Sequence, residues 1–196
     1  MTDFIEFPKM ARLSRDIVVT EKLDGTNAQI LITADGKIKA GSRTRWITPD
    51  DDNFGFAAWV FANKEQLLGL GEGRHFGEWW GRGIQRGYGL QERRFSLFNS
   101  LRWCNHWEEP QTIPAADPRI LKTQQKAPNC CHVVPVLYRG IFNQMMIDEV
   151  LYDLKNYGSS AATGFMKPEG VVIYHISGNV GFKKTIEKDG HPKGII

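Results

Sequence analysis

Short segments rich in β-branched and aromatic residues, separated by turn signals, recur along the chain and restrict the folds open to it. The first two occupy residues 17–20 and 28–33. The Lys-Leu-Asp-Gly-Thr-Asn sequence between them predicts a hairpin-like turn that presents polar side chains. An Asp35-Gly36 turn signal then leads into a third strand that ends near residue 45. Further strands are predicted at residues 75–80, 94–98, 132–138, 170–176 and 180–186.

Two helices are predicted, far apart in the sequence. Thr48 can cap a helix with Pro49 at its first position, and its buried side is expected to carry Phe54, Ala58, Trp59 and Phe61. The second helix spans residues 143–157, where apolar residues recur at three- and four-residue spacing before Gly158. Residues 105–129 lack periodicity, which predicts a long loop or insertion. Many short strands with two separated helices favour an antiparallel-rich α+β fold.

Length and composition indicate one globular domain, residues 1–196. With 41% hydrophobic residues and no apolar run near the roughly 20 residues that cross a bilayer, a membrane partner is not expected. The N-terminus lacks the features of a signal peptide, and three cysteines without framework spacing agree with a reducing compartment, so a cytoplasmic location is expected. The net charge of +3 neither indicates nor excludes a polyanionic partner.

Lys22 has the sequence surroundings of a nucleophile. It ends a predicted strand, and Asp24 and Gly25 follow it in the turn. A lysine amine attacks only when neutral, so an enzyme that uses one must lower its pKa by nearby positive charge or desolvation. Asp24 would share the strand face of Lys22 if the strand continued, and there it could orient the amine or a leaving group. Alone the motif is a weak signal, because a solvated hairpin tip would look the same.

Further charged residues follow Lys22, each beside a predicted strand, and in this order the chain resembles a known family. This family is the covalent lysyl-AMP nucleotidyltransferases, which comprise ATP-dependent RNA ligases, DNA ligases and mRNA capping enzymes. The resemblance covers residues 17–188, and residues 21–27 are most similar to the RNA ligases that seal nicks in duplexes. The matching motifs are Lys22-Leu23-Asp24-Gly25, Ser42-Arg43-Thr44, Phe76-Gly77-Glu78, Arg94-Phe95-Ser96-Leu97-Phe98-Asn99, Glu169-Gly170-Val171-Val172 and Phe182-Lys183-Lys184.

The resemblance implies an antiparallel-sheet-rich nucleotidyltransferase (adenylation) domain, with an ATP pocket between sheets and no OB domain. Lys22 would attack the α-phosphate of ATP to give lysyl-AMP. AMP would pass to a polynucleotide 5′-phosphate, and a 3′-hydroxyl would then displace it. Lys183 and Lys184 would supply positive charge at the α-phosphate, together with magnesium or manganese. Glu169 is expected to bind this metal through water, because magnesium dehydrates reluctantly.

The resemblance also implies contacts to the nucleotide. Phe98 would stack on adenine, Glu78 would accept from the ribose hydroxyls, and Arg43 would contact the ribose or a strand terminus. Secondary contacts are expected from Glu21, to adenine, and from Asn27.

Two pairs of residues leave alternatives open. Phe95 and Phe98 are three apart and face opposite sides of a strand, so only one can line the pocket, and Phe98 is favoured. Lys183 and Lys184 are adjacent and would point to opposite faces of a regular strand. One of the two lysines is therefore expected to face solvent, and Lys183 is favoured as the phosphate contact.

A glycine- and arginine-rich segment at residues 81–89 is the strongest local basic patch, and such a backbone can follow phosphates, although an ordinary surface loop would read the same. Nucleic acid, as a nicked duplex or RNA ends, is the expected partner, bound by Arg43, Arg45, Arg82 and Arg86. An ATP-dependent RNA ligase is favoured; an ATP-dependent DNA ligase, or a non-catalytic binding module with a ligase-like fold, stays an alternative. A monomer is expected, with a protein partner that could supply an accessory domain.

Overall fold

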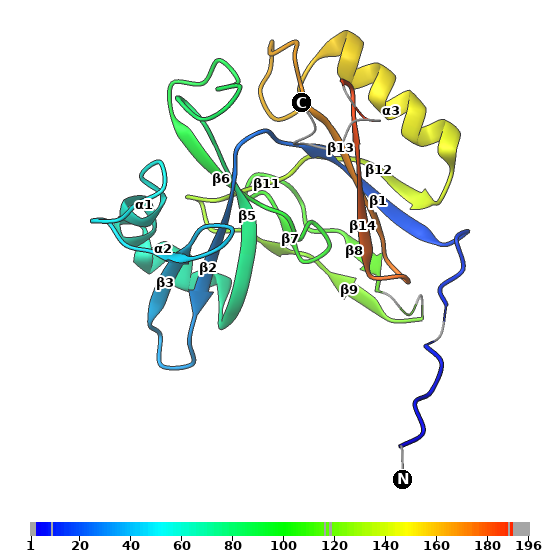
Figure 1. Cartoon of the computed structure of the whole chain (residues 1–196), viewed down its shortest axis with the longest axis horizontal. Helices are drawn as coiled ribbons and strands as arrows, with labels where there is room; N and C mark the ends of the chain where they lie inside the picture. The colour runs from blue at the N-terminus through cyan, green and yellow to red at the C-terminus, as the bar shows by residue number, and fades with distance from the viewer. Residues whose placement is uncertain (1–2, 9, 116, 118, 188, 190–196) are drawn as a thin grey trace.

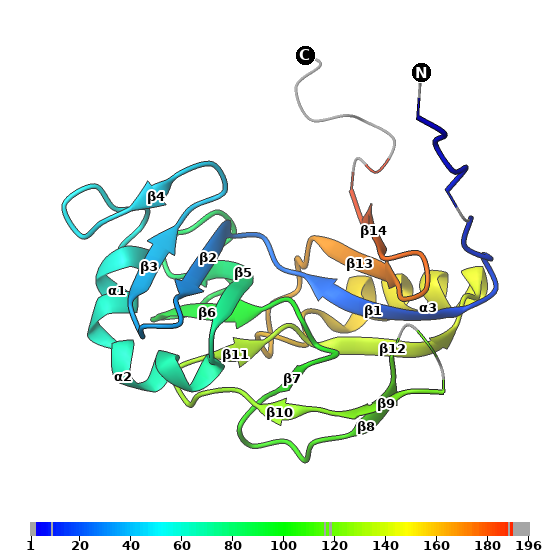
Figure 2. The ribbon, with the colours of Figure 1, turned by 90° about the horizontal axis from the view of Figure 1, so that it is seen from below.

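A computed structural model describes residues 3–8, 10–115, 117, 119–187 and 189 of the chain. Two sheets lie side by side, with the helices on their outer sides (Figures 1 and 2). Within these two sheets, the pairing of β11 (His132–Val133) with β6 (Arg93–Leu97) is parallel, and the other pairings are antiparallel. The predicted antiparallel-rich α+β architecture is confirmed.

The six-stranded sheet, in the order β11-β6-β5-β2-β3-β4, packs one face on the main hydrophobic core. In β2 the alternate residues Ala28, Ile30 and Ile32 are buried in this core, because successive side chains of a strand point to opposite faces. Its strands are β2 (Thr26–Ile32), β3 (Ile38–Gly41), β4 (Trp46–Ile47), β5 (Gly73–Gly81), β6 (Arg93–Leu97) and β11 (His132–Val133).

The four-stranded sheet, in the order β12-β1-β13-β14, is covered on one face by the predicted second helix, α3 (Gln144–Tyr157). The Asn143 side chain caps α3 by accepting from the Met145 amide, and Ile147, Val150 and Leu154 pack on the sheet, which confirms the predicted stripe. The strands are β1 (Asp16–Lys22), β12 (Val136–Ile141), β13 (Gly170–His175) and β14 (Val180–Thr185).

The predicted hairpin between β1 and β2 is wrong. β1 pairs with β12 and β13, whereas β2 pairs with β3 and β5, so residues 23–25 carry the chain from one sheet to the other. Each strand buries its apolar residues in a different core, and that requirement separates two segments that are neighbours in sequence. The crossing is tight at Gly25, where an added Cβ would lie 2.7 Å from the Cβ of Trp80 and closer still to the carbonyl oxygen of Trp79.

The predicted first helix begins later than Pro49. The structure has β4, a turn, and then α1 (Phe56–Ala62), α2 (Lys64–Leu67) and the 3-10 helix η1 (Leu68–Leu70). Asp52 accepts from the amides of Ala57 and Ala58, so one of the acidic residues does stabilise a helix start, about two turns further on. This shift changes the buried face to Phe56, Ala57 and Val60, and it leaves Phe54 and Phe61 exposed.

The segment at residues 105–129 has more structure than predicted. β8 (Thr112–Pro114) and β9 (Leu121–Thr123) form a small hairpin, and β10 (Gln125–Lys126) pairs with β7 (Trp103–Cys104). Similarly, Val134 and Pro135 divide the strand predicted at residues 132–138 into β11 and β12. In the described part of the chain, no helix is both long and apolar enough to cross a membrane.

Gly25→Ala tests the tight crossing. The new Cβ would overlap backbone of β5, so we expect the free energy of unfolding to fall by about 1–3 kcal/mol. Gly181→Ala in β14 is the matched control, since nothing lies within 4 Å of its added Cβ. Urea denaturation of both variants measures the difference, and equal stability of the two would contradict the close approach at Gly25.

Candidate active site

A cleft of about 1310 Å³ opens between the two sheets. β1, β13 and β14 line one side with Val18, Thr20, Lys22, Val172 and Lys183. The other side comes from the six-stranded sheet, and the β8–β9 hairpin adds further residues. The cleft is large enough for a nucleotide-sized ligand, because ligand pockets usually measure about 300–1,000 Å³.

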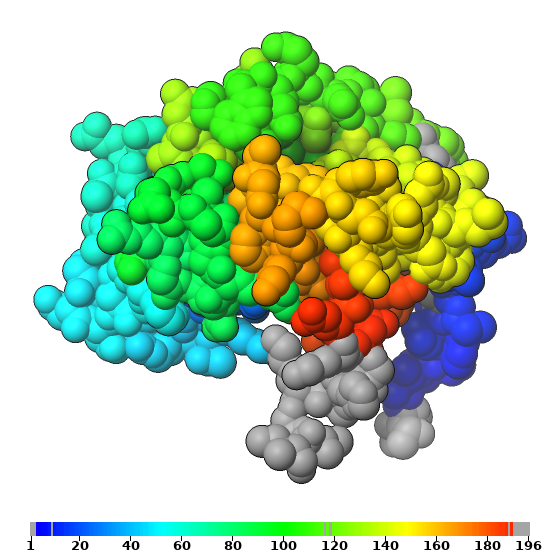
Figure 3. Space-filling view, turned by 90° about the horizontal axis from the view of Figure 1, so that it is seen from above, coloured from blue at the N-terminus to red at the C-terminus, as the bar shows by residue number. Residues whose placement is uncertain are grey.

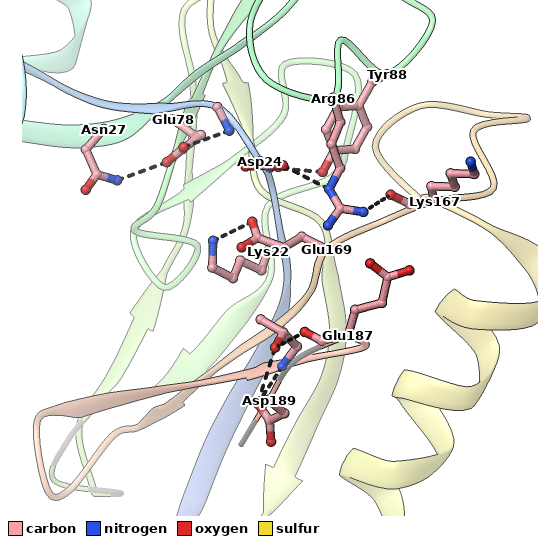
Figure 4. Close-up of polar contacts among 12 residues, drawn as sticks. Lys22, Asp24, Asn27, Glu78, Arg86, Tyr88, Lys167, Glu169, Glu187 and Asp189 are labelled. Atoms are coloured by element: carbon pink, nitrogen blue, oxygen red, sulfur yellow. Dashed lines mark hydrogen bonds and ion pairs between the residues drawn. The ribbon is translucent and has the colours of Figure 1, made fainter. Parts of the chain in front are cut away.

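Lys22 lines this cleft and forms an ion pair with Glu169, with 2.6 Å between Nζ and Oε2 (Figure 4). The two residues are 147 positions apart in sequence. Antiparallel pairing of β1 with β13 places Lys22 opposite Gly170, and Glu169 directly precedes that glycine. The Lys22 side chain is 22% exposed and that of Glu169 only 7%, so the amine is the more accessible of the two groups.

Glu78 is buried beside this pair and is held by Gly25 and Asn27. Its Oε1 accepts from the Gly25 amide and its Oε2 from the Asn27 side chain, both at 3.0 Å. Burial disfavours the charged carboxylate and raises the pKa of Glu78 to about 7, although Lys22 and the two hydrogen bonds act in the opposite direction. Glu78 therefore titrates near neutral pH in the free protein.

Phe98 and Phe95 follow the predicted division. Phe98 lines the cleft and is 42% exposed, whereas Phe95 is fully buried in the core. On the opposite wall, Lys183 pairs with Val172, and both residues line the cleft. The cleft thus brings together Lys22, Glu78, Lys183 and Phe98, with the Glu169 carboxylate paired to Lys22.

A family model for RNA ligases matches residues 15–188 of the chain. The chain belongs to the RNA ligase family. A search of curated proteins returned no match.

The fold is similar to solved structures of Naegleria gruberi RNA ligase. One of them, a mutant with AMP and manganese, superposes with a TM-score of 0.57 at 22% identity, over 88% of this chain and 50% of that chain. Another mutant, with ATP and manganese, gives 0.57 at 20% identity, over 94% of this chain and 57% of that chain. This RNA ligase family member thus spans about half the length of those solved chains, and the likeness establishes its nucleotidyltransferase-like fold.

Asp24 does not orient Lys22 in this RNA ligase fold. β1 ends at Lys22, so the two side chains do not share a strand face. Asp24 instead accepts from Arg86 Nε at 2.9 Å, and its amide donates to the hydroxyl of Tyr88 (Figure 4). Arg86 also donates to the Lys167 carbonyl. Its guanidinium therefore links the crossing segment at Asp24 to the segment before Glu169, which reduces its availability for nucleic acid.

Glu21 lies at the cleft, but its side-chain oxygens are used within the protein. It alternates with Lys22 along β1, is 1% exposed, and accepts from the Ser159 hydroxyl and from the amides of Ser160 and Ala161. Burial raises its pKa, and these three hydrogen bonds oppose that shift. Glu21 therefore fixes the segment after α3, which Figure 3 shows in orange beside the green loop at residues 82–90.

Lys184 also departs from its predicted catalytic role. It pairs with Val171, which is buried under α3, and its Nζ lies 2.6 Å from the Asp148 carboxylate on that helix. Strand alternation, correctly predicted for the two lysines, thus sends Lys183 into the cleft and Lys184 away from it.

The arginines predicted to bind nucleic acid fall into different environments. Arg43 is exposed and lines the cleft. Arg45 forms an ion pair with Asp51, which reduces its availability for a phosphate. Arg82 is exposed in the loop that follows β5, outside the residues that line the cleft.

Tyr88 and Lys122 were missed in the sequence. Tyr88 has a left-handed backbone, with φ 54°, and lies between Gly87 and Gly89. This unusual conformation holds its hydroxyl on the Asp24 amide, and the flanking glycines were the available signal. Lys122 reaches the cleft from β9, in the segment that lacked periodicity, so no sequence signal pointed to it.

Glu78→Gln tests the raised pKa. Because the folded state holds the Glu78 proton to a pKa of about 7 rather than the ordinary 4.5, its stabilising contribution is complete below about pH 4.5 and is lost as the pH rises through 7. Glutamine does not titrate. The stability of the wild type relative to Glu78→Gln should therefore fall by on the order of 2–3 kcal/mol between about pH 5 and pH 8, measured by urea denaturation. A constant difference across this range would contradict the shift.

Proposed function

We propose that this domain is the adenylation domain of an ATP-dependent RNA ligase. The observation that carries the proposal is the position of Lys22 in the cleft, within 2.6 Å of Glu169, with Lys183 and Phe98 lining the same cavity. Membership of the RNA ligase family favours RNA over DNA as the substrate. A module without turnover would need none of this arrangement around a lysine amine.

In the first step, Lys22 Nζ would attack the α-phosphorus of ATP. The N–P bond forms as the bond to the bridging oxygen breaks, pyrophosphate leaves, and the nitrogen loses a proton. The terminal 5′-phosphate of a strand would then attack the same phosphorus and release the amine. A 3′-hydroxyl would finally attack that 5′-phosphate, so that the phosphodiester bond forms and AMP leaves.

The residues of the cleft can support these steps by position and charge. Phe98 presents an exposed ring to an adenine base, and Lys183 brings positive charge from the opposite wall. Glu78 can accept from a ribose hydroxyl when ionised, with Asn27 beside it, and Arg43 is placed for the ribose or a strand end. Glu21, Asp24 and Arg86 would act indirectly, because they hold the backbone around Lys22.

The carboxylates present fit a magnesium or manganese ion that also binds the phosphates of ATP. Only Oε2 of Glu169 is used by Lys22, which leaves its second oxygen for water-mediated coordination. Among the described residues, no group of three or more His, Cys, Asp or Glu side chains is arranged to hold a metal ion. Such an ion would neutralise negative charge on the phosphates.

We extend the proposal to the organisation of the protein. Residues 1–196 are proposed to form one domain that works as a monomer on nucleic acid ends in the cytoplasm, where the three cysteines would stay reduced as they are here. We also propose that a partner protein supplies an accessory domain that acts with it.

Labelling with radioactive ATP tests the role of the lysines. The wild type should acquire a covalent label that survives denaturation, and Lys22→Ala should acquire none. Lys183→Ala should label at least about 100-fold more slowly, because it removes a charge aimed at the developing transition state. Lys184→Ala is the matched control, since its partner Asp148 lies outside the cleft, and should label at a rate near that of the wild type. Equal labelling by Lys22→Ala would overturn the proposed function.

Glu169→Gln separates a metal role from a role in holding Lys22. We expect slower labelling together with a several-fold increase in the magnesium concentration that gives half-maximal labelling. Asp148→Asn, which removes a carboxylate outside the cleft, should leave that concentration unchanged. If Glu169→Gln slows labelling with no change in the magnesium dependence, the residue positions Lys22 and does not bind the metal.

A further inference from the structure

The face of the six-stranded sheet opposite its core carries a row of side chains that leads out of the cleft. The Phe98 amide donates to the Phe76 carbonyl, Phe76 pairs with Gln29, Gln29 with Gly41, and Gly41 with Trp46. Directly paired residues point to the same face of a sheet. The row therefore runs from the aromatic ring in the cleft to β4 at the edge, across strands spaced about 4.8 Å apart.

Besides Phe98, two aromatic side chains in this row are exposed to solvent. Phe76 is 52% exposed and Trp46 is 43% exposed. The Trp46 ring lies across Gly41, where an added Cβ would come within 3.1 Å of it, so the glycine lets the ring lie on the sheet. Exposed aromatic rings on one face of a sheet offer flat surfaces on which bases can stack.

Two cations flank the Trp46 ring. Arg74 Cζ lies 5.2 Å from its centroid and Lys39 Nζ lies 5.9 Å from it. Both residues pair with Leu31, which places them in the next row of the same face. Arg74 is further fixed by donating to the Gln29 side chain at 2.9 Å.

These cations are available for an anionic partner. Among the described residues, no carboxylate forms an ion pair with Lys39 or Arg74, whereas nearby Arg45 is paired with Asp51. Arg74 and Phe76 also line the cleft, so the face and the cleft form one continuous surface.

We infer that this outer face, formed by Lys39, Trp46, Arg74 and Phe76, binds an unpaired polynucleotide strand next to the end that is joined. Bases would stack on the two rings, and the cations would meet the phosphates. The strand must be unpaired, because the base faces of a duplex are already covered by stacking. The inference rests on the proposed function and deepens it, since it assigns the protein a single-stranded flank as substrate.

Direct binding tests the outer face without ATP. The probe is a fluorescent RNA of about 12 nucleotides without secondary structure, compared by anisotropy with a blunt RNA duplex of the same length. The wild type should bind the single strand more tightly. Trp46→Ala should weaken that binding about tenfold and change duplex binding little. Lys39→Ala should weaken it less and should reduce its dependence on salt.

Trp107→Ala is the matched control. Trp107 is 57% exposed but packs on His106 and on His132 of β11, at the other edge of the sheet, so the variant should bind RNA as the wild type does. Circular dichroism verifies the fold of each variant, and Lys39→Ala decides the matter if Trp46→Ala does not fold.

Single-strand affinity that is unchanged in Trp46→Ala and Lys39→Ala would overturn the inference, as would equal or tighter binding of the duplex by the wild type. If the outer face binds a protein partner instead, the two substitutions would leave the single-strand affinity unchanged. Covalent labelling of the wild type by ATP is measured separately and needs no RNA. If ATP labels the wild type but Trp46→Ala and Lys39→Ala bind RNA as tightly as the wild type does, the proposed function holds and only the inference about the outer face is wrong.

Discussion

The antiparallel pairing of β1 with β13 is the constraint on which the site depends. It sets Lys22 opposite Gly170 and so brings the amine onto Glu169. The same register buries Ile17 and Val19 under α3 and leaves Val18 and Thr20 in the cleft. A slip by one residue would exchange these faces and expose the apolar residues. The hydrophobic contact with α3 therefore holds the register that places the reactive group.

Most polar residues next to Lys22 are used to fix the backbone. Glu21 holds the segment after α3, and Asp24 holds Arg86. Arg86 also binds the Lys167 carbonyl, two residues before Glu169, so one guanidinium ties the two halves of the ion pair together. These groups are thus satisfied by contacts within the protein. Lys22 is the last residue of β1, and residues 23–25 after it belong to neither sheet, so this end of the strand needs such support.

The sequence was sufficient for features that depend on local pattern and insufficient for those that depend on pairing. Alternation along a strand separated Lys183 from Lys184 and Phe95 from Phe98, and the structure places them accordingly. The partner of Asp24 lies 62 residues away in a loop, and no local pattern encodes that contact. The hairpin prediction failed for the same reason: strand propensity says where strands occur but not which core each one covers.

The alternation that builds the core also builds the functional surface. In β2, residues Ala28 and Ile30 enter the core, so Asn27 and Gln29 must face the other way. Asn27 contacts Glu78 inside the cleft, while Gln29 contacts Arg74 on the outer face. One strand thus contributes to the cleft through Asn27 and to the proposed strand-binding face through Gln29. A polynucleotide that followed this face would enter the cleft beside Phe98, where Lys22 lies on β1 of the other sheet.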